Sequence, residues 1–270
     1  MSSSSLGDSS LLLWLMAAVV LVLGAYLFIG WVRRAQDAEH WKQALWPSVI
    51  AGASIGIVIP SSMTLALAAE PLPFPLGYLW VAVPVLFLAP MVACVPVALW
   101  LTRRQNWLAL IGSGVLLSAI ALAVQAGWVM SAGLRPGIRW QFDLMGGAIA
   151  VTVLGLVAAS WLAYSDASGD GGRKSLWRAG AAGLIALTLV SGQEVVVSAV
   201  GLLGQVGSVY KREASSTIMC LIGGALVPTV LAMAALDLAL RNSTDRKRSR
   251  RGVQLNIPKR RKRRRKYRAL

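Results

Sequence analysis

Polar side chains interrupt three otherwise apolar segments of this chain at similar positions. Ser61 and Ser62 break the first segment, Gln125 breaks the second, and Gln193 with Glu194 breaks the third. The spacing is regular, with 64 residues from 61 to 125 and 68 from 125 to 193. A polar group inside a membrane segment is costly and is usually kept for a binding site or for contacts between helices. These five residues are therefore the candidate ligand-sensing site.

The five residues offer neutral hydrogen-bond chemistry together with one carboxylate. Hydroxyl and amide groups can hold a small polar ligand, or they can join helices through bonds that average about 0.6 kcal/mol in one membrane protein. Glu194 could act as a protonatable sensor, reach toward the membrane surface, or pair with Arg135 or Arg139 of a neighbouring loop. The sequence leaves ligand binding, proton sensing and helix contacts open.

Sulfur-containing residues also lie toward the same ends of their apolar segments, namely Met63, Met130, Met219 and Cys220. Thioether and thiolate ligands suit Cu(I), whereas methionine also fills gaps in apolar cores. The chain has a single histidine, His40, in a polar loop, so one copy cannot supply a multi-histidine metal site. Copper binding through sulfur and plain packing both remain open.

The sequence contains no recognisable catalytic constellation. With His40 as its one histidine, the body of the chain cannot form a Ser–His–Asp triad. It also lacks a glycine-rich phosphate loop and paired carboxylates within its apolar segments. We therefore expect a protein that is not an enzyme.

The composition predicts an integral membrane protein. Hydrophobic residues make up 56% of the chain and charged residues only 14%, whereas soluble domains carry about 25% charged residues. A spanning helix needs about 20 mostly apolar residues. Seven segments meet this requirement: 11–32, 47–68, 79–101, 107–130, 144–164, 178–200 and 217–240. The predicted fold is all-α, with seven transmembrane helices.

Six of these helices form three helix–loop–helix repeats, and the first helix stands outside them. The repeats cover 47–101, 107–164 and 178–240, within a membrane domain at 1–240. The polar breaks fall on the first helix of each repeat, so they could face one another. Gly52 and Gly56, four residues apart, predict a close helix contact, and Asp237 and Arg241 predict an i,i+4 ion pair.

The distribution of basic residues predicts the orientation. The loops after the first, third and fifth helices hold eight Lys and Arg residues, and the N-terminus and the other loops hold four. The positive-inside rule then places the N-terminus outside and the C-terminus in the cytoplasm. The polar layer would lie in the outer third of the membrane.

The last thirty residues, 241–270, form a polybasic segment. It carries 15 of the 27 Lys and Arg residues and lacks a periodic apolar face, so we expect a disordered cytoplasmic tail. Its densest part comprises Arg260, Arg261, Lys262, Arg263, Arg264, Arg265 and Lys266. Such cations attract anionic lipids at about 1 kcal/mol each near the surface, and a docking role toward an acidic partner stays open. Without interleaved aromatic residues or a nucleic-acid-binding fold, we do not expect sequence-specific nucleic-acid binding.

The arrangement resembles the bacterial MHYT sensor domain over residues 1–240. Gly56-Ile57 matches the Gly-Ile before the family's first motif, and Pro71 or Pro73 matches its later Leu-Pro. GSGVLLSAIALAVQAG and LIALTLVSGQEVVVSAVGL match the second and third units. The resemblance implies seven spans, a bacterial inner-membrane location and a sensing function through a bound metal, which in the family is proposed to be copper.

The motif residues themselves depart from the family. Its motif histidines fall on Ser61, Gln125 and Gln193, and its methionines fall near 60, 124 and 192. Serine and glutamine are poor ligands for copper beside imidazole and thioether groups. The resemblance therefore implies the family's fold for this chain but not its copper site. The sulfur residues are the groups that could replace the missing copper ligands.

The sequence favours a membrane sensor or signalling module without an output domain of its own, acting through a cytoplasmic partner or the basic tail. One alternative is a structural membrane subunit that recruits a partner through the tail. Another is a small transporter, although the inner halves of the polar-layer helices offer few polar groups beyond serines such as Ser48, Ser54, Ser113 and Ser118. Homo-oligomerisation stays open.

Overall fold

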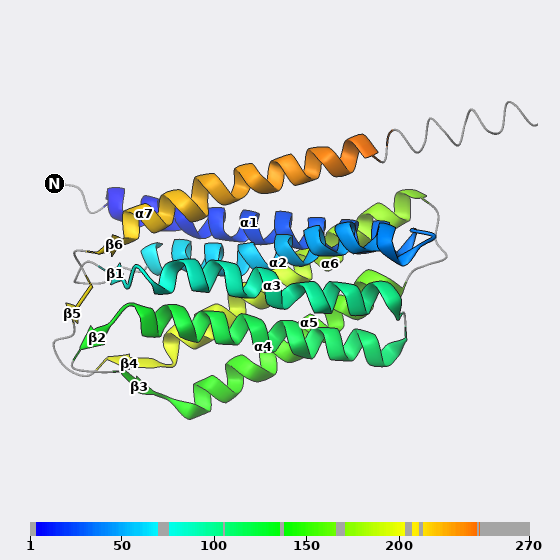
Figure 1. Ribbon diagram of the computed structural model, residues 1–270. Helices are drawn as coiled ribbons and strands as arrows, with labels where there is room; N and C mark the ends of the chain where they lie inside the picture. The colour runs from blue at the N-terminus through cyan, green and yellow to red at the C-terminus, as the bar shows by residue number, and fades with distance from the viewer. Residues whose placement is uncertain are drawn as a thin grey trace, which may run out of the picture. The chain divides into compact units, whose positions relative to one another are not determined.

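The computed structural model describes residues 4–69, 76–104, 106–135, 138–165, 171–202, 207–210, 213–241 and 243. In this part of the chain, seven helices are long and apolar enough to cross a membrane. They are α1 (Ser4–Gln36), α2 (Trp41–Ala69), α3 (Ala82–Arg103), α4 (Trp107–Ser131), α5 (Phe142–Ser165), α6 (Gly171–Ser198) and a seventh helix over Ser216–Arg241 (Figure 1). The predicted all-α, seven-helix membrane fold is confirmed.

The seventh helix contains a change of helix type. It begins as α7 (Ser216–Leu221), widens into the π-helical segment η1 (Ile222–Leu226) and continues as α-helix to 241. The Ser215 side chain caps its start by accepting a hydrogen bond from the Ile218 N–H at 3.4 Å. A π segment shifts the register of backbone bonding and often occurs at functional positions.

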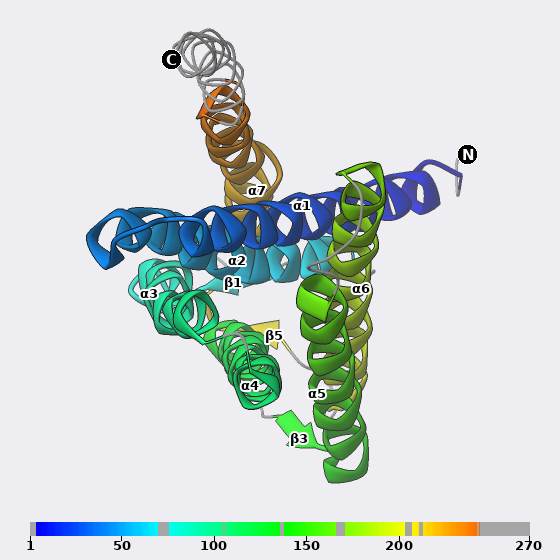
Figure 2. The same cartoon turned by 90° about the vertical axis from the view of Figure 1, so that its right-hand side faces the viewer.

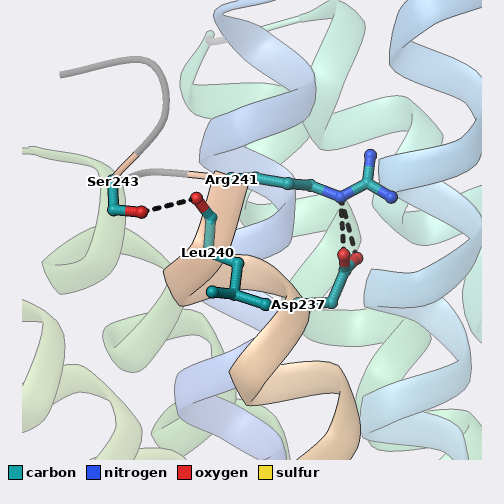
Figure 3. Close-up of polar contacts among 4 residues, drawn as sticks. All are labelled: Asp237, Leu240, Arg241 and Ser243. Atoms are coloured by element: carbon teal, nitrogen blue, oxygen red, sulfur yellow. Dashed lines mark hydrogen bonds and ion pairs between the residues drawn. The ribbon is translucent and has the colours of Figure 1, made fainter. Parts of the chain in front are cut away.

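The chain divides into two compact units, Met1–Leu231 and Ala232–Leu270. In the second unit the predicted ion pair is confirmed: Arg241 Nε lies 2.8 Å from Asp237 Oδ1 and 2.9 Å from Oδ2 (Figure 3). The Ser243 hydroxyl donates to the Leu240 carbonyl nearby. The tail residues 244–270, with the basic cluster predicted to bind lipid or a partner, lie outside the described residues.

Helix α2 forms the centre of the first unit. In its most apolar window 78% of the residues are buried, compared with 22% to 50% in the other spans. It contacts α1 and α3 extensively and also meets α4, α6, α7 and η1. Figure 2 shows the first six helices as three adjacent pairs, α1 with α2, α3 with α4, and α5 with α6. Because α2 touches so many elements, its side chains reach several neighbours at once.

The close helix contact predicted from Gly52 and Gly56 is present between α2 and α3. A Cβ atom added to Gly52 would lie 2.6 Å from the Val95 backbone, and one added to Gly56 would lie 2.5 Å from Met91 Cα and from the Pro90 carbonyl oxygen. The absence of side chains at both positions lets the two backbones touch.

Among the described residues, six short strands lie together at one end of the first unit, here named the strand end (Figure 1). They are β1 (Gly77–Tyr78), β2 (Leu134–Arg135), β3 (Ile138–Trp140), β4 (Val200–Leu202), β5 (Gly207–Ser208) and β6 (Ala214–Ser215). They form three antiparallel pairs, β1 with β6, β2 with β5, and β3 with β4. The loop between α6 and α7 thus pairs with both of the other loops at this end.

Ser208 strengthens this connection between loops. Its hydroxyl lies 2.7 Å from the Ala132 carbonyl and 3.1 Å from the Gly77 carbonyl, and its oxygen accepts from the Gly77 N–H at 3.3 Å. The sequence predicted these strands only as loops, because two or three residues are too few to give a readable alternation.

Candidate functional site

Three of the predicted polar residues lie at a similar depth on α2, α4 and α6: Ser62 contacts Gln193, and Gln125 reaches α6 at Leu189, one turn before Gln193. Ser62, Gln125 and Gln193 are each at most 2% exposed, and the three helices contact one another. Counted along each helix at about 1.5 Å per residue, all three lie roughly 8 to 11 Å from the strand end. We name this set the polar layer. Its depth follows from the similar position of each polar break within its repeat.

The hydrogen bonds inside the polar layer are long. Ser62 Oγ lies 3.4 Å from Gln193 Oε1 but only 2.9 Å from the Ile59 carbonyl. A hydroxyl has one hydrogen to donate, and the shorter contact is the stronger bond. Gln125 Nε2 reaches the Leu189 carbonyl at 3.5 Å, and Gln125 Oε1 is buried without a protein partner. The Gln125 amide therefore keeps unused hydrogen-bonding capacity, and the bond between Ser62 and the Gln193 amide is weak.

Ser61 faces a different neighbour. Its hydroxyl donates to the Gly223 carbonyl of η1 at 2.8 Å, and Thr64 of the same face donates to the Ser61 carbonyl at 2.8 Å. Gly223 fits against this face because a Cβ there would lie 2.7 Å from Thr64 Oγ1. The structure thus separates the two serines: Ser62 belongs to the polar layer, and Ser61 joins α2 to the seventh helix.

Glu194 follows Gln193 on α6 and is partly exposed, in contrast to its fully buried neighbour. It takes part in an interaction of its own. Successive residues of a helix point about 100° apart, so Glu194 and Gln193 face different surroundings. The layer itself is thus built from neutral groups.

Two aromatic residues adjoin the polar layer, and sequence reasoning did not single them out. The rings of Tyr78 and Trp128 meet edge to face with centroids 5.0 Å apart, and Phe87 also packs against Trp128 at 5.7 Å. Trp128 lies three residues after Gln125, so the two share a face of α4. The i,i+3 spacing of Gln125 and Trp128 was the only sequence signal that Trp128 belongs near the layer. The sequence held no signal for Tyr78, because Tyr78 comes from a loop.

Both aromatic residues carry buried polar atoms. The Tyr78 hydroxyl and the Trp128 Nε1 are buried without a protein partner. Burial raises the pKa of the Tyr78 hydroxyl, and the nearby Cys220 thiol adds to the rise. The phenol therefore stays protonated and able to donate at physiological pH.

The candidate copper ligands differ in their burial. Met63 and Met219 are fully buried and Cys220 is partly exposed, but Met130 is 65% exposed on α4. Met63 lies seven residues, or two turns, after Gly56, on the face that meets α3, whereas the seventh helix contacts the face of Ser61. Among the described residues no group of three or more His, Cys, Asp or Glu side chains could hold a metal ion.

Chemically, the arrangement can bind a small polar molecule through hydrogen bonds. It offers amide, hydroxyl and indole groups from α2, α4, α6 and β1, all with little or no access to solvent. The hydroxyl and amide groups of the layer are poor ligands for a soft metal.

Comparison of the chain with models of known protein families, with curated proteins and with solved structures gave no match. The seven helices define an integral membrane protein, and the assignment of its function rests on the site itself.

Proposed function

We propose that this chain is a membrane sensor of degenerate MHYT type that detects a small ligand through the polar layer of Ser62, Gln125 and Gln193. The single observation that carries the proposal is the poor hydrogen bonding of two glutamines that are each only 1% exposed: Gln125 Oε1 has no partner among the described residues, and the other bonds of the two amides are 3.4 and 3.5 Å long. A buried polar group without a good partner costs roughly 1–3 kcal/mol. Such a cost is expected where a ligand completes the bonding.

Other buried polar groups of the same protein provide the comparison. Ser118 of α4 donates to the Gly114 carbonyl at 2.7 Å and lies 3.1 Å from the Thr152 carbonyl of α5, and Thr152 donates to Ala148 at 2.7 Å. Each hydroxyl thus has a short bond within its own helix, and the contact that joins α4 to α5 is 3.1 Å long. The bonds between helices that involve the two glutamines are longer, at 3.4 and 3.5 Å, so helix joining alone does not account for these amides.

The proposed orientation places the strand end outside the cell and the C-terminus in the cytoplasm. Eight basic residues in the loops at the opposite end, against four at the strand end and the N-terminus, support it. The polar layer would then lie near the outer face of a bacterial inner membrane. A signal would leave through the seventh helix, whose π segment is bonded to Ser61, toward a cytoplasmic partner.

The test compares the transcriptome of a host strain lacking the gene with strains that carry wild-type or variant copies. Gln125→Leu and Gln193→Leu should reproduce the deletion, because leucine keeps the volume and removes the amide. Thr152→Val, which alters a buried polar group outside the layer, should behave as wild type. Membrane levels are measured by immunoblot. Full complementation by both glutamine variants would show that the polar layer is not the sensing site.

A further inference from the structure

The polar layer extends into a second set of unused polar atoms. Gln125 Oε1, Trp128 Nε1 and the Tyr78 hydroxyl are all buried without a protein partner, in side chains that are at most 1% exposed. Buried polar atoms are nearly always hydrogen-bonded. Three exceptions in connected residues therefore indicate an occupant, which is either a molecule that the site is built for or ordered water.

The three atoms lie on adjoining side chains. Gln125 and Trp128 share one face of α4, one turn apart, and Tyr78 packs edge-on against Trp128 at 5.0 Å. Backbone pairing of β1 with β6 holds Tyr78 in place, through Tyr78 opposite Ala214 and Gly77 opposite Ser215. The site is thus enclosed by α4 on one side and by the strand end on another.

The chemistry of the three atoms is complementary to one kind of molecule. The indole N–H can only donate, the glutamine oxygen can only accept, and the phenol, protonated at physiological pH, can donate. Two donors suit one carbonyl oxygen, and the glutamine oxygen suits an N–H or O–H of the same molecule. These groups and the neighbouring Ser62 and Gln193 are all uncharged, so an ion buried there would lack a counter-charge and would bind poorly.

We propose that Gln125, Trp128 and Tyr78 bind one small neutral molecule that carries both a carbonyl oxygen and a hydrogen-bond donor, as in a primary amide. The inference rests on the proposed function and names the class of ligand that it detects. It also adds Tyr78 and Trp128 to the site as the donors that select for the carbonyl oxygen.

Ligand-observed NMR by saturation transfer, on the full-length protein in lipid nanodiscs, tests the inference. The probe is acetamide, and acetate is the comparison, because the two have nearly the same size and shape and differ in charge. Acetamide should show saturable binding and acetate should neither bind nor compete. Each of Tyr78→Phe, Trp128→Phe and Gln125→Leu should weaken acetamide binding about three- to tenfold, the effect of one neutral hydrogen bond.

Matched variants outside the site control for general effects. Tyr26→Phe and Gln141→Leu change the same residue types at exposed positions and should leave acetamide binding unchanged. Tyr78→Phe removes a hydroxyl that has no protein partner, so the variant should unfold at a midpoint no lower than wild type. This measurement separates loss of binding from loss of folding.

Each outcome distinguishes the inference from the proposed function. If Gln193→Leu weakens acetamide binding but Tyr78→Phe and Trp128→Phe do not, the polar layer stands and the two aromatic donors are wrongly assigned. If acetate binds as well as acetamide, the ligand is not selected for neutrality. If acetamide does not bind at all, ordered water fills the site and the ligand class is wrong, while the complementation assay still decides the sensing function.

Discussion

Substitution of Gly56 by alanine tests the central packing of the fold. The added Cβ would lie 2.5 Å from Met91 Cα and 2.5 Å from the Pro90 carbonyl oxygen, whereas carbon atoms in good contact lie about 3.5–4.0 Å apart. Both neighbours are backbone atoms, so no side-chain rotation can relieve the clash, and α2 and α3 must separate by roughly 1 Å. Overpacking of this kind typically costs about 1–3 kcal/mol. We therefore expect Gly56→Ala to be clearly destabilising.

Gly183→Ala provides the matched control within α6. No atom lies within 4 Å of a Cβ placed there, and replacing a helical glycine by alanine typically stabilises by about 0.5–1 kcal/mol. The free energies of unfolding of both variants are compared with wild type in one detergent, followed by intrinsic tryptophan fluorescence. The two substitutions should change stability in opposite directions. If Gly56→Ala is as stable as Gly183→Ala, the described contact between α2 and α3 is incorrect.

Four further predictions follow from single contacts. Ser208→Ala should lower the free energy of unfolding by about 1–3 kcal/mol, because the Gly77 and Ala132 carbonyls lose their hydroxyl partner; an unchanged value would contradict this role. Asp237→Asn should change it by less than about 0.5 kcal/mol, since the pair with Arg241 is 41% to 46% exposed; a larger loss in chemical denaturation would show that the pair is not simply a surface contact. Elemental analysis after copper exposure should find far less than one copper per chain, because Met130 is 65% exposed and the polar layer offers amide and hydroxyl groups that are poor copper ligands; stoichiometric copper would refute this. Burial raises the pKa of Tyr78 above its ordinary value, so its neutral phenol is favoured in the folded state; the stability of wild type relative to Tyr78→Phe should stay constant from about pH 6 to pH 9 and fall as pH rises through about 10, where the unfolded chain loses the proton first.

The helices of this protein were predictable because each depends on its own sequence. Runs of about 20 apolar residues are sufficient to define a membrane span, and the predicted segment 107–130 corresponds to α4 at Trp107–Ser131. The Gly52 and Gly56 pair likewise predicted a close contact, because only glycine allows backbones to touch. The partner helix was not predictable, since the spacing says nothing about which neighbour the face meets. The strand pairs were missed for a similar reason: each joins residues sixty or more positions apart.

The polar layer was predictable in part. Its depth followed from the position of each polar residue within its segment: Ser62 contacts Gln193, and Gln125 reaches the same helix one turn away, at Leu189. The sequence could not predict that Ser61 and Ser62 face different neighbours, because the rotation of α2 about its axis is set by packing with five or more neighbouring elements. The place of Tyr78 in the site could not be predicted either, since the loop that carries it is positioned by pairing with Ala214 and Ser215. Sequence reasoning therefore identified the helix-borne half of the site and missed the half that comes from the strand end.

The two adjacent serines of α2 explain how the polar layer could influence the rest of the protein. Ser62 touches Gln193 of α6, and Ser61, about 100° around the helix, donates to the Gly223 carbonyl of η1. A ligand that draws the Gln193 amide toward itself would remove the weaker of the two Ser62 contacts, and any resulting rotation of α2 would act directly on the Ser61 bond. A π segment is the part of the seventh helix best able to respond, because its backbone bonding is already out of α-helical register. The connection from the layer to the seventh helix therefore requires only two neighbouring residues of the most buried helix in the fold.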